Sequence, residues 1–321
     1  MIETNELCVF VSVVKRASFA QAAAMHTLTP SGVSRIVSRL EARLGARLLQ
    51  RSTRKLSLTP AGSLFFARAV EILRSVADAQ DEVARDSLAP RGVLRMTVPT
   101  VFGRLHVLPL LAQFMQRFPL LKLDINFTDR YVDLIEQGID LAIRVGAVPD
   151  SRLVARRLCS NRKLLVASPD YLQRRGTPQT AVELVEHDCL VFMAHSQPHV
   201  WRLSGAEGPM TVAVSGPVIS NNGEVATEAA KQGLGVAPGA TFSIGSALLS
   251  GELVRVLPEY EFDYSGIYLL FPTARQLPKK VRLMADTLVQ AFPDPPRWDL
   301  PLAERFADFS AVVHDADARM L

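Results

Sequence analysis

The sequence predicts an all-α N-terminal region that a long helix joins to an α/β region. Three observations support this fold class: capped helical patterns before residue 60, one uninterrupted helical pattern from Thr59 to about Leu88, and strand–helix alternation from residue 90 onward. With 321 residues, of which 48% are hydrophobic, the chain is long enough for two or three domains. We expect segments at 1–60, 61–89, 90–295 and 296–321.

Three short helices are expected before Gly45, a residue suited to end the third of them. Ser18 is placed to cap the second helix and Thr29 to cap the third, where Pro30 follows in the first turn. The first helix carries an apolar stripe at helical spacing, formed by Leu7, Phe10, Val11 and Val14.

The third helix has one apolar face and one polar face. The apolar side chains that should face a core are Val33, Val37, Leu40 and Leu44. The opposite face carries short hydroxyls and arginines, namely Ser31, Arg35, Ser38 and Arg39. Such a face can enter the major groove of DNA closely and hydrogen-bond to base edges or phosphates.

A basic hairpin is expected directly after the third helix. Arg51, Arg54 and Lys55 lie between the apolar residues 48–49 and 56–58. In this position they would contact the phosphate backbone, where charge raises affinity for any sequence. The layout is that of a winged helix-turn-helix; the alternative is a small helical bundle with a solvated basic loop.

Charge favours the first interpretation. Residues 1–60 hold nine Lys or Arg and three Glu, a net charge of +6. The whole chain carries +4, so the remaining residues together carry −2. Because the basic excess is confined to the first 60 residues, it indicates nucleic-acid binding by this region.

Four motifs in this region resemble the N-terminal domain of the LysR-type transcriptional regulators. They are Ser18-Phe19-Ala20-Gln21-Ala22-Ala23, Ser34-Arg35 with Leu40-Glu41, Leu44-Gly45-Ala46-Arg47-Leu48-Leu49, and Leu58-Thr59-Pro60-Ala61-Gly62. The resemblance implies a double-stranded DNA operator as a partner. The candidate DNA-binding residues are Thr29, Ser31, Ser34, Arg35, Ser38, Arg39, Arg51, Arg54 and Lys55.

The helical pattern after Thr59 would form a rod of roughly 40 Å. Its apolar side includes Phe65 and Leu73, and so small an N-terminal domain cannot cover a rod of this length. A second copy packed antiparallel is the natural partner. The family resemblance likewise implies a dimer through this helix and a tetramer as the full assembly, with RNA polymerase as a further candidate partner. The alternative is an exposed spacer helix.

Beyond Ala89-Pro90-Arg91-Gly92, which breaks the helix, strands and helices alternate and predict a mostly parallel sheet. Expected elements include strands near 94–98, 121–127 and 141–145, a helix over 104–118, and a short helix from Tyr131 to Gln137. A second unit begins near Arg162. This pattern predicts a two-lobe, periplasmic-binding-protein-like effector domain, which the family also has. Lobe I would span 90–161 and 266–295, and lobe II 162–265.

A small effector is expected between the lobes, where strand ends meet helix N-termini. The candidate effector-binding residues at these places are Thr100, Val101, Phe102, Arg144, Gly146, Asn221 and Asn222. Their chemistry favours an anionic or aromatic molecule, because the Arg144 guanidinium can pair with a carboxylate. Two structural alternatives to effector contact stay open. Thr100 and Asn222 would then only cap helices, and Arg144 would form a structural ion pair with Asp129 or Asp140.

Other functional classes find little support. Neighbouring residues in His187-Asp188-Cys189 do not face one another on a strand, and Pro198 separates His195 from His199. We expect no catalytic residue, no metal site and no cofactor. The three cysteines are too sparse for a disulfide framework and suggest a reducing cytoplasm; a Cys159–Cys189 redox switch is the less favoured reading. No segment resembles a membrane helix or a signal peptide, so a cytoplasmic protein without membrane contact is expected.

The C-terminal tail lies beyond the resemblance, which ends near residue 292. Its apolar side chains recur at helical spacing at Leu302, Phe306, Phe309 and Val313. We expect an amphipathic helix that docks on an effector domain; the alternative is a frayed tail.

The function expected from the sequence is that of a sequence-specific DNA-binding transcriptional regulator, modulated by a small effector and without enzymatic activity. The alternative is a small-molecule-binding or enzymatic α/β domain whose basic N-terminus is an oligomerisation module.

Overall fold

The computed structural model describes residues 2–51, 56–83, 90–146, 153–193, 198–262, 265–272, 277–306 and 309. The chain divides into two compact units. One consists of residues 1–91 with 132–140, and the other of residues 92–131 with 141–321.

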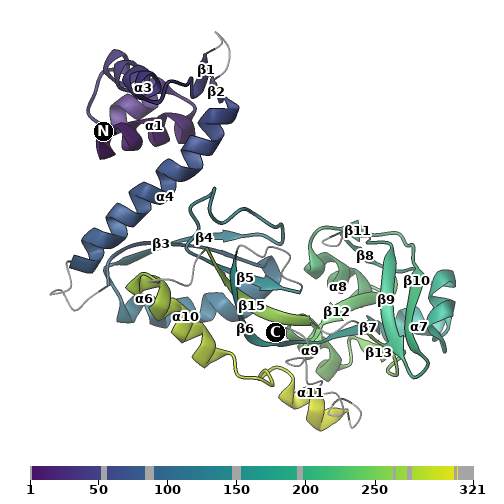
Figure 1. Ribbon diagram of the computed structural model, residues 1–321. Coiled ribbons are helices and arrows are strands. Elements are labelled where there is room, and N and C mark those ends of the chain that lie inside the picture. Colours follow the sequence, from purple (N-terminus) through teal and green to yellow (C-terminus); the bar gives the residue numbers. More distant parts are fainter. Residues whose placement is uncertain are drawn as a thin grey trace. The chain divides into compact units, whose positions relative to one another are not determined.

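The first unit contains the predicted helices and hairpin (Figure 1). Its elements are α1 (Thr4–Arg16), α2 (Phe19–Met25), α3 (Pro30–Leu44), β1 (Leu49–Arg51), β2 (Leu56–Leu58) and α4 (Pro60–Val83). β1 and β2 pair antiparallel, with Leu49 opposite Leu58. The core gathers the predicted apolar stripes, because Phe10, Val37 and Leu40 are fully buried.

The long helix α4 is joined tightly to the hairpin. The Thr59 hydroxyl caps it by accepting a hydrogen bond from the Gly62 N–H at 2.9 Å. A Cβ atom at Gly62 would lie 1.9 Å from the Leu48 carbonyl oxygen, so only glycine permits this approach. The 24 described residues of α4 make a rod of roughly 36 Å. Residues 84–89, which complete the predicted helix, lie outside the described residues.

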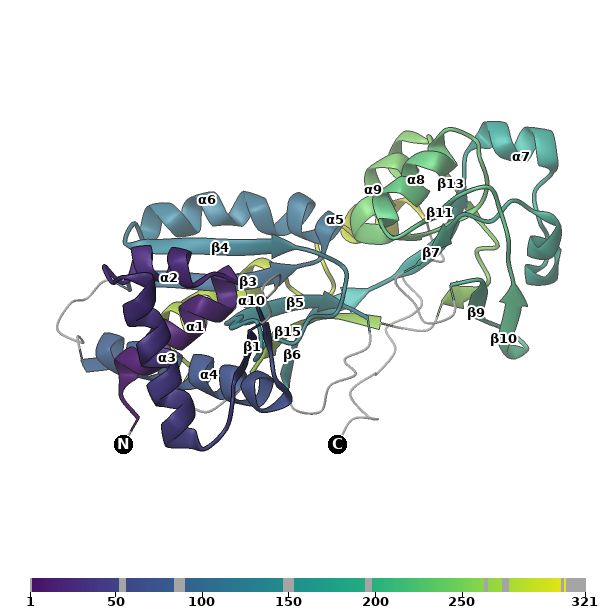
Figure 2. The same cartoon turned by 90° about the horizontal axis from the view of Figure 1, so that it is seen from above.

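Lobe I is built on one five-stranded sheet with the order β4-β3-β5-β15-β6. Its strands are β3 (Gly92–Val98), β4 (Leu121–Phe127), β5 (Leu141–Val145), β6 (Val154–Asn161) and β15 (Ser265–Phe271). Its helices are α5 (Thr100–Phe102), the π-helical turn η1 (Gly103–Val107), α6 (Leu108–Arg117) and α10 (Lys279–Ala291). Figure 2 shows α6 lying along the sheet, and side chains of α6 and α10 share one core with β3 and β15.

Four of the five strands run in the same direction, as the sequence predicted for a mostly parallel sheet, and β15 runs against them. β3 runs parallel to β4 and β5, but β15 is antiparallel to both β5 and β6. β15 is the strand by which the chain returns from lobe II, so it enters the sheet from the opposite end.

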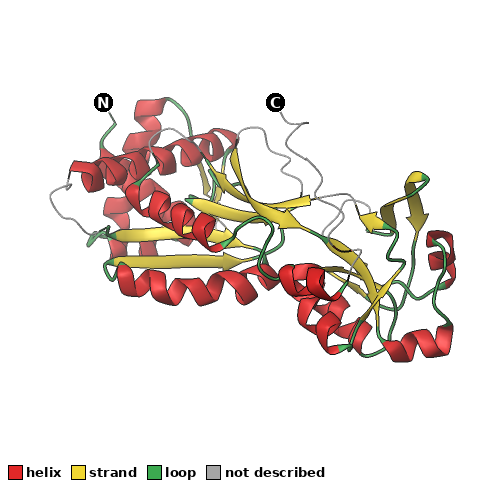
Figure 3. Ribbon diagram, turned by 90° about the horizontal axis from the view of Figure 1, so that it is seen from below, coloured by secondary structure: helices red, strands yellow, loops and turns green. Residues whose placement is uncertain are grey.

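Lobe II holds smaller sheets with helices against them (Figure 3). Its described strands pair in the orders β12-β7-β13, β11-β8 and β10-β9-β14. The strands are β7 (Lys163–Ala167), β8 (Val191–Phe192), β9 (Val200–Gly205), β10 (Gly208–Ala213), β11 (Ile219–Ser220), β12 (Ala237–Ala240), β13 (Val254–Val256) and β14 (Glu261–Phe262). The helices are α7 (Pro169–Arg175), the 3₁₀ turn η2 (Ala181–Glu186), α8 (Gly223–Lys231) and α9 (Thr241–Ser250).

Between the start of β3 and the end of β15 the chain passes between the lobes twice. It leaves the lobe I sheet at Asn161 and enters a lobe II sheet at Lys163, and it returns between Phe262 and Ser265. The two crossings meet, because the Asn161 amide donates a hydrogen bond of 2.8 Å to the Ser265 hydroxyl. Asn161 is almost fully buried at this point.

Two predicted helices differ from the structure. Residues 131–137 form hydrogen-bonded turns and no helix. The Asp133 carboxylate caps a single turn by accepting the N–H groups of Ile135 and Glu136, both at 2.9 Å, and Gly138 closes that turn in a left-handed conformation, so no longer helix forms. In the tail, helix α11 (Leu300–Arg305) is short and ends before Phe306, while Val313 lies outside the described residues.

No helix in the described part of the chain is long and apolar enough to cross a membrane.

Candidate nucleic-acid interface and effector site

The candidate reading helix α3 is fixed at both ends. The Thr29 hydroxyl accepts a hydrogen bond of 3.1 Å from the Gly32 N–H, and Gly45 closes the other end with its N–H on the Ala42 carbonyl. Thr29 therefore caps the helix, as the sequence predicted, and its hydroxyl also lies 3.1 Å from that of Ser31.

Exposure along α3 follows the two predicted faces. Val33, Val37 and Leu40 have no exposed surface. The candidate contact residues Ser31, Arg35, Ser38 and Arg39 are exposed, and Ser34 is half-buried. The helix thus presents hydroxyls and arginines to the solvent on one side, which is the chemistry that reads a major groove.

A buried carboxylate holds part of this face in place. Both oxygens of Glu6, on α1, accept hydrogen bonds of 2.9 Å, one from Arg39 Nε and one from Arg43 Nη1. The Glu6 side chain is fully buried, whereas Arg39 remains 54% exposed. Arg39 therefore has a structural role that joins α3 to α1, in addition to the contact predicted for it.

The pKa of Glu6 is lowered overall. Burial raises the pKa, but the hydrogen bond from the Glu3 N–H and the Arg39 and Arg43 guanidinium groups outweigh that effect. The Glu6 side chain also accepts the N–H of Glu3 at 3.1 Å, which completes a capping box at the start of α1. The carboxylate stays charged where it anchors the arginines.

A second glutamate sets the position of the wing. Glu41 Oε1 accepts from the backbone N–H groups of Leu48 at 2.8 Å and Leu49 at 3.1 Å, so the end of α3 is tied to the first strand of the hairpin. Arg51 pairs with Leu56 at the last described register position. Arg54, Lys55 and the Arg51 side chain lie outside the described residues.

In lobe I, Thr100 begins a helix that continues through η1 into α6. Thr100 is half-buried and Val101 is mostly buried. Phe102 has no exposed surface, because its ring packs 5.3 Å from Phe242 and 5.2 Å from Phe292, measured between ring centroids. The aromatic wall predicted at Phe102 is thus part of a core rather than an open surface.

Arg144 is buried at the end of β5 and donates to oxygens of its own lobe. The acceptors are Thr128 O at 3.3 Å, Ile143 O at 3.0 Å, Thr97 Oγ1 at 3.3 Å and Arg130 O at 3.2 Å. Burial lowers the pKa of Arg144, and Tyr131 and Asp129 offset part of that shift. The guanidinium therefore holds the loop after β4. Gly146 follows in a left-handed conformation, with its N–H on the Gly266 carbonyl at 2.9 Å.

In lobe II, Asn222 caps α8, since its side-chain oxygen accepts the Glu224 N–H at 2.9 Å. Asn221, just before it, is exposed. The Glu224 carboxylate pairs with Arg104 of η1, in lobe I. This ion pair brings together the two helix starts that the sequence singled out, one in each lobe, and neither of its members was among the predicted residues.

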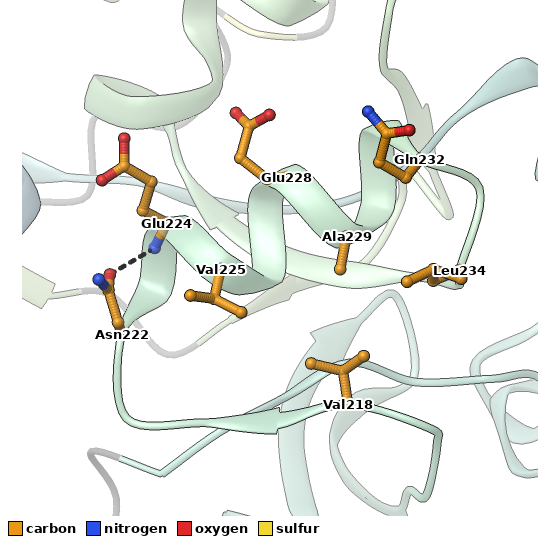
Figure 4. Close-up of a pocket in the computed structure, with 8 residues that line it drawn as sticks. All are labelled: Val218, Asn222, Glu224, Val225, Glu228, Ala229, Gln232 and Leu234. Carbon is orange, nitrogen blue, oxygen red and sulfur yellow. Dashed lines mark hydrogen bonds between the residues drawn. The ribbon is translucent and has the colours of Figure 1, made fainter.

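A groove of about 410 Å³ runs along α8 (Figure 4). Its floor is apolar, formed by Val218, Val225, Ala229 and Leu234, and Glu224 and Glu228 stand beside it. Of the predicted effector residues, Asn222 is the one that lines it. An acidic, apolar groove is poorly suited to an anionic ligand.

The cysteines face apolar surroundings. The Cys189 thiol donates to the Leu184 carbonyl at 3.4 Å, and burial raises the pKa of both Cys159 and Cys189 to about 12. Thiols in this state are poor nucleophiles at neutral pH. Among the described residues, no group of His, Cys, Asp and Glu side chains is arranged to hold a metal ion.

Comparison with known proteins assigns both units. Residues 4–63 match the bacterial regulatory helix-turn-helix protein, lysR family, and residues 88–293 match the LysR substrate binding domain. The chain belongs to the LysR-type family of transcriptional regulators. It is thus a DNA-binding regulator with an effector-binding domain, from a family of regulators rather than enzymes.

Relatives of this regulator match over nearly their whole length. The HTH-type transcriptional regulator DmlR of Escherichia coli is 34% identical over 307 residues, covering 95% of this chain and 96% of DmlR. The structure of CrgA from Neisseria meningitidis is 33% identical with a TM-score of 0.58, covering 90% of this chain and 99% of CrgA. The full-length structure of the Vibrio cholerae virulence activator AphB is 27% identical with a TM-score of 0.61, at 90% and 99% coverage.

The sequence patterns did not predict which glutamates pair with the regulator's arginines and backbone N–H groups. Glu6, Glu41 and Glu224 each hold a cation or backbone N–H groups. A signal existed for one of them, because Glu3 and Glu6 have the spacing of a capping box. Glu224 pairs with a residue 120 positions away, which no local pattern can indicate.

We predict that Glu6→Gln lowers the stability of the N-terminal unit by about 1–3 kcal/mol at pH 7, because a fully buried partner of two arginines loses its charge. The folded pKa is lowered, so the contribution is present above the unfolded value near 4.5 and fades as pH falls through the folded value. Urea unfolding at pH 7 and pH 4, with hydrogen exchange in α1 and α3, measures both effects.

Glu71→Gln is the matched control, since Glu71 pairs with Arg68 on the exposed surface of α4. Equal destabilisation by both substitutions, or a Glu6→Gln effect that does not shrink with acid, would contradict this account of Glu6.

Proposed function

We propose that this regulator binds a specific operator through α3 and the wing, and that a small anionic or aromatic effector held between the lobes modulates that binding. The observation that carries the proposal is the exposed face of α3, where Ser31, Arg35 and Ser38 lie opposite a fully buried apolar stripe. Thr29, Ser34 and Arg39 complete that contact set, while Arg51, Arg54 and Lys55 of the wing would contact phosphates.

The effector proposal rests on the two helix starts joined by the Arg104–Glu224 ion pair. Thr100 and Asn222 lie at those starts, where backbone N–H groups and helix dipoles favour anions. Arg144 would act by fixing the loop after β4 and by contributing positive charge beside Thr128. Val101, Gly146 and Asn221 complete the proposed site.

A dimer through α4 is also proposed, with a tetramer as the full assembly, a cytoplasmic location and RNA polymerase as a partner. Leu73, expected in the seam, packs with Phe65 and Phe66 against the core of the N-terminal unit. Among the α4 residues whose side chains the structure describes, the large apolar ones that are exposed are Leu64 and Ile72, at 69% and 47% exposure, and they are the better candidates for a contact between copies.

Arg35→Ala should weaken binding to a selected operator by about 1–3 kcal/mol while leaving the fold intact, because an exposed base-contacting arginine is lost. The operator is first obtained by selecting bound duplexes from a random pool, and affinity is then measured by gel shift at fixed salt. Binding to scrambled DNA should change less than binding to the operator. If the two affinities fall equally, Arg35 contacts phosphate and base readout must lie elsewhere.

Ile72→Glu should reduce the molar mass measured by light scattering, since a charge placed in an apolar contact between copies is costly. Val182→Glu is the matched control: Val182 is 64% exposed and belongs to lobe II rather than to α4. An unchanged mass for Ile72→Glu would exclude α4 as the main contact between copies.

We expect a screen of small carboxylates and aromatic acids to yield a compound that raises the Tm of the full chain. A ligand at 100 times its Kd stabilises the folded protein by about 2.7 kcal/mol. Thr100→Val should diminish that rise, whereas Thr177→Val, on the surface of lobe II, should not. A Tm rise that survives Thr100→Val would place the ligand outside the proposed site.

A further inference from the structure

The C-terminal segment crosses from lobe I to lobe II after the family match ends at residue 293. It follows α10 and leads to α11, which lies against α9 of lobe II (Figure 1). The described residues 294–306, together with Phe309, are called the strap below. The two chain crossings at Asn161–Lys163 and Phe262–Ser265 already join the lobes, so the strap is a third connection between them.

Its first end is bound to lobe I. Asp294 Oδ1 accepts hydrogen bonds from the Ser160 N–H at 3.2 Å and the Ser160 hydroxyl at 2.7 Å. The other oxygen, Oδ2, pairs with Arg157 Nη2 at 3.2 Å. Both partners lie on β6, one of the two edge strands of the lobe I sheet.

Its middle lies among rings of both lobes. The Trp298 ring centroid is 4.5 Å from that of His106 and 5.9 Å from that of Phe102, both in lobe I. It is 6.3 Å from the ring of Phe242, on α9 of lobe II. His106 also bridges the lobes directly, since its Nε2 lies 2.9 Å from the Phe242 carbonyl oxygen. Aromatic contacts of this kind resist sliding, because they fix both distance and orientation.

Its far end is buried in lobe II. Leu302 has no exposed surface and contacts α9 beside Gly245. Arg305 Nη1 donates to the Leu249 carbonyl at 2.5 Å. Phe309 is 5% exposed, with the Arg162 guanidinium 4.2 Å from its ring centroid.

Arg162 connects this end to the hinge itself. It is the single residue between β6 and β7, and so forms the first crossing. Its guanidinium donates to the Phe309 carbonyl and pairs at 3.3 Å with Glu261 of β14, the strand just before the second crossing. One side chain thus contacts the strap and both crossings.

We propose that the strap restrains the angle between the two lobes. Two crossings that meet at Asn161 and Ser265 act as one hinge, about which the lobes could rotate. A third connection, bound to β6 at one end and to α9 at the other, opposes that rotation. The inference needs neither the effector nor the operator, so it stands or fails separately from the proposed function.

The test measures the distance distribution between the lobes in the full chain, without DNA or ligand. Spin labels are attached to Leu120→Cys in lobe I and Val182→Cys in lobe II, two exposed positions. The native Cys159 and Cys189 are buried thiols with a pKa of about 12, and burial raises the pKa of Cys8, so labelling at pH 7 favours the introduced sites. Labelled chains are diluted with unlabelled ones to suppress distances between copies.

Detaching either end should broaden the distribution. Leu302→Ala with Phe309→Ala releases the lobe II end, and Asp294→Ala releases the lobe I end without touching the lobe II core. Leu300→Ala is the matched control, because Leu300 lies in the same helix and is 50% exposed. If the distance distributions of Asp294→Ala and of the Leu302→Ala, Phe309→Ala double variant are both as narrow as that of Leu300→Ala, the proposal is overturned.

Hydrogen exchange distinguishes a restraint on the angle between the lobes from simple stabilisation of lobe II. The proposal predicts faster exchange in the strap itself, with β7 and α9 still protected in Asp294→Ala. Loss of protection throughout lobe II with an unchanged distance distribution would show that the tail only stabilises that lobe, and would overturn the restraint.

Discussion

The two-lobe architecture depends on the contact between Asn161 and Ser265. Both chain crossings pass this point, and the buried Asn161 amide joins them by a hydrogen bond of 2.8 Å. Because each lobe has its own sheets, rotation about this point would move one helix start relative to the other. The ion pair of Arg104 with Glu224 joins those two helix starts across the lobes.

Several arginines of this protein donate hydrogen bonds to acceptors of the same chain. Arg144 donates to four oxygens of lobe I, and Arg39 and Arg43 share the carboxylate of Glu6. A planar guanidinium with several donors can hold a loop or a helix in one orientation while part of it stays accessible. This explains how Arg39 can fix α3 against α1 and still lie 54% exposed on the face proposed to contact DNA.

The tail is proposed to restrain the angle between the lobes of the effector-binding domain, and it lies outside the part of the chain that matches the family. Its contacts combine a carboxylate on β6, an aromatic cluster shared by the lobes, and apolar burial on α9. Two lobes joined only by a pair of neighbouring crossings can rotate about them. A further attachment away from the hinge line limits that rotation. Phe102 packs in the aromatic cluster around Trp298, so the restraint on lobe rotation also acts on the start of the lobe I helix.

The sequence by itself determined the elements whose signals are local. Helix caps at Ser18 and Thr29, the apolar stripe through Val33 and Leu40, and the basic hairpin after Leu49 all depend on residues a few positions apart. Local patterns predicted too long an element after Asp133, where a capped turn is closed at once by Gly138. Tertiary structure alone decided that Phe102 is core, that Arg144 holds a loop, and that Glu224 meets Arg104. Those roles depend on partners from distant segments, and only the folded chain brings such segments together.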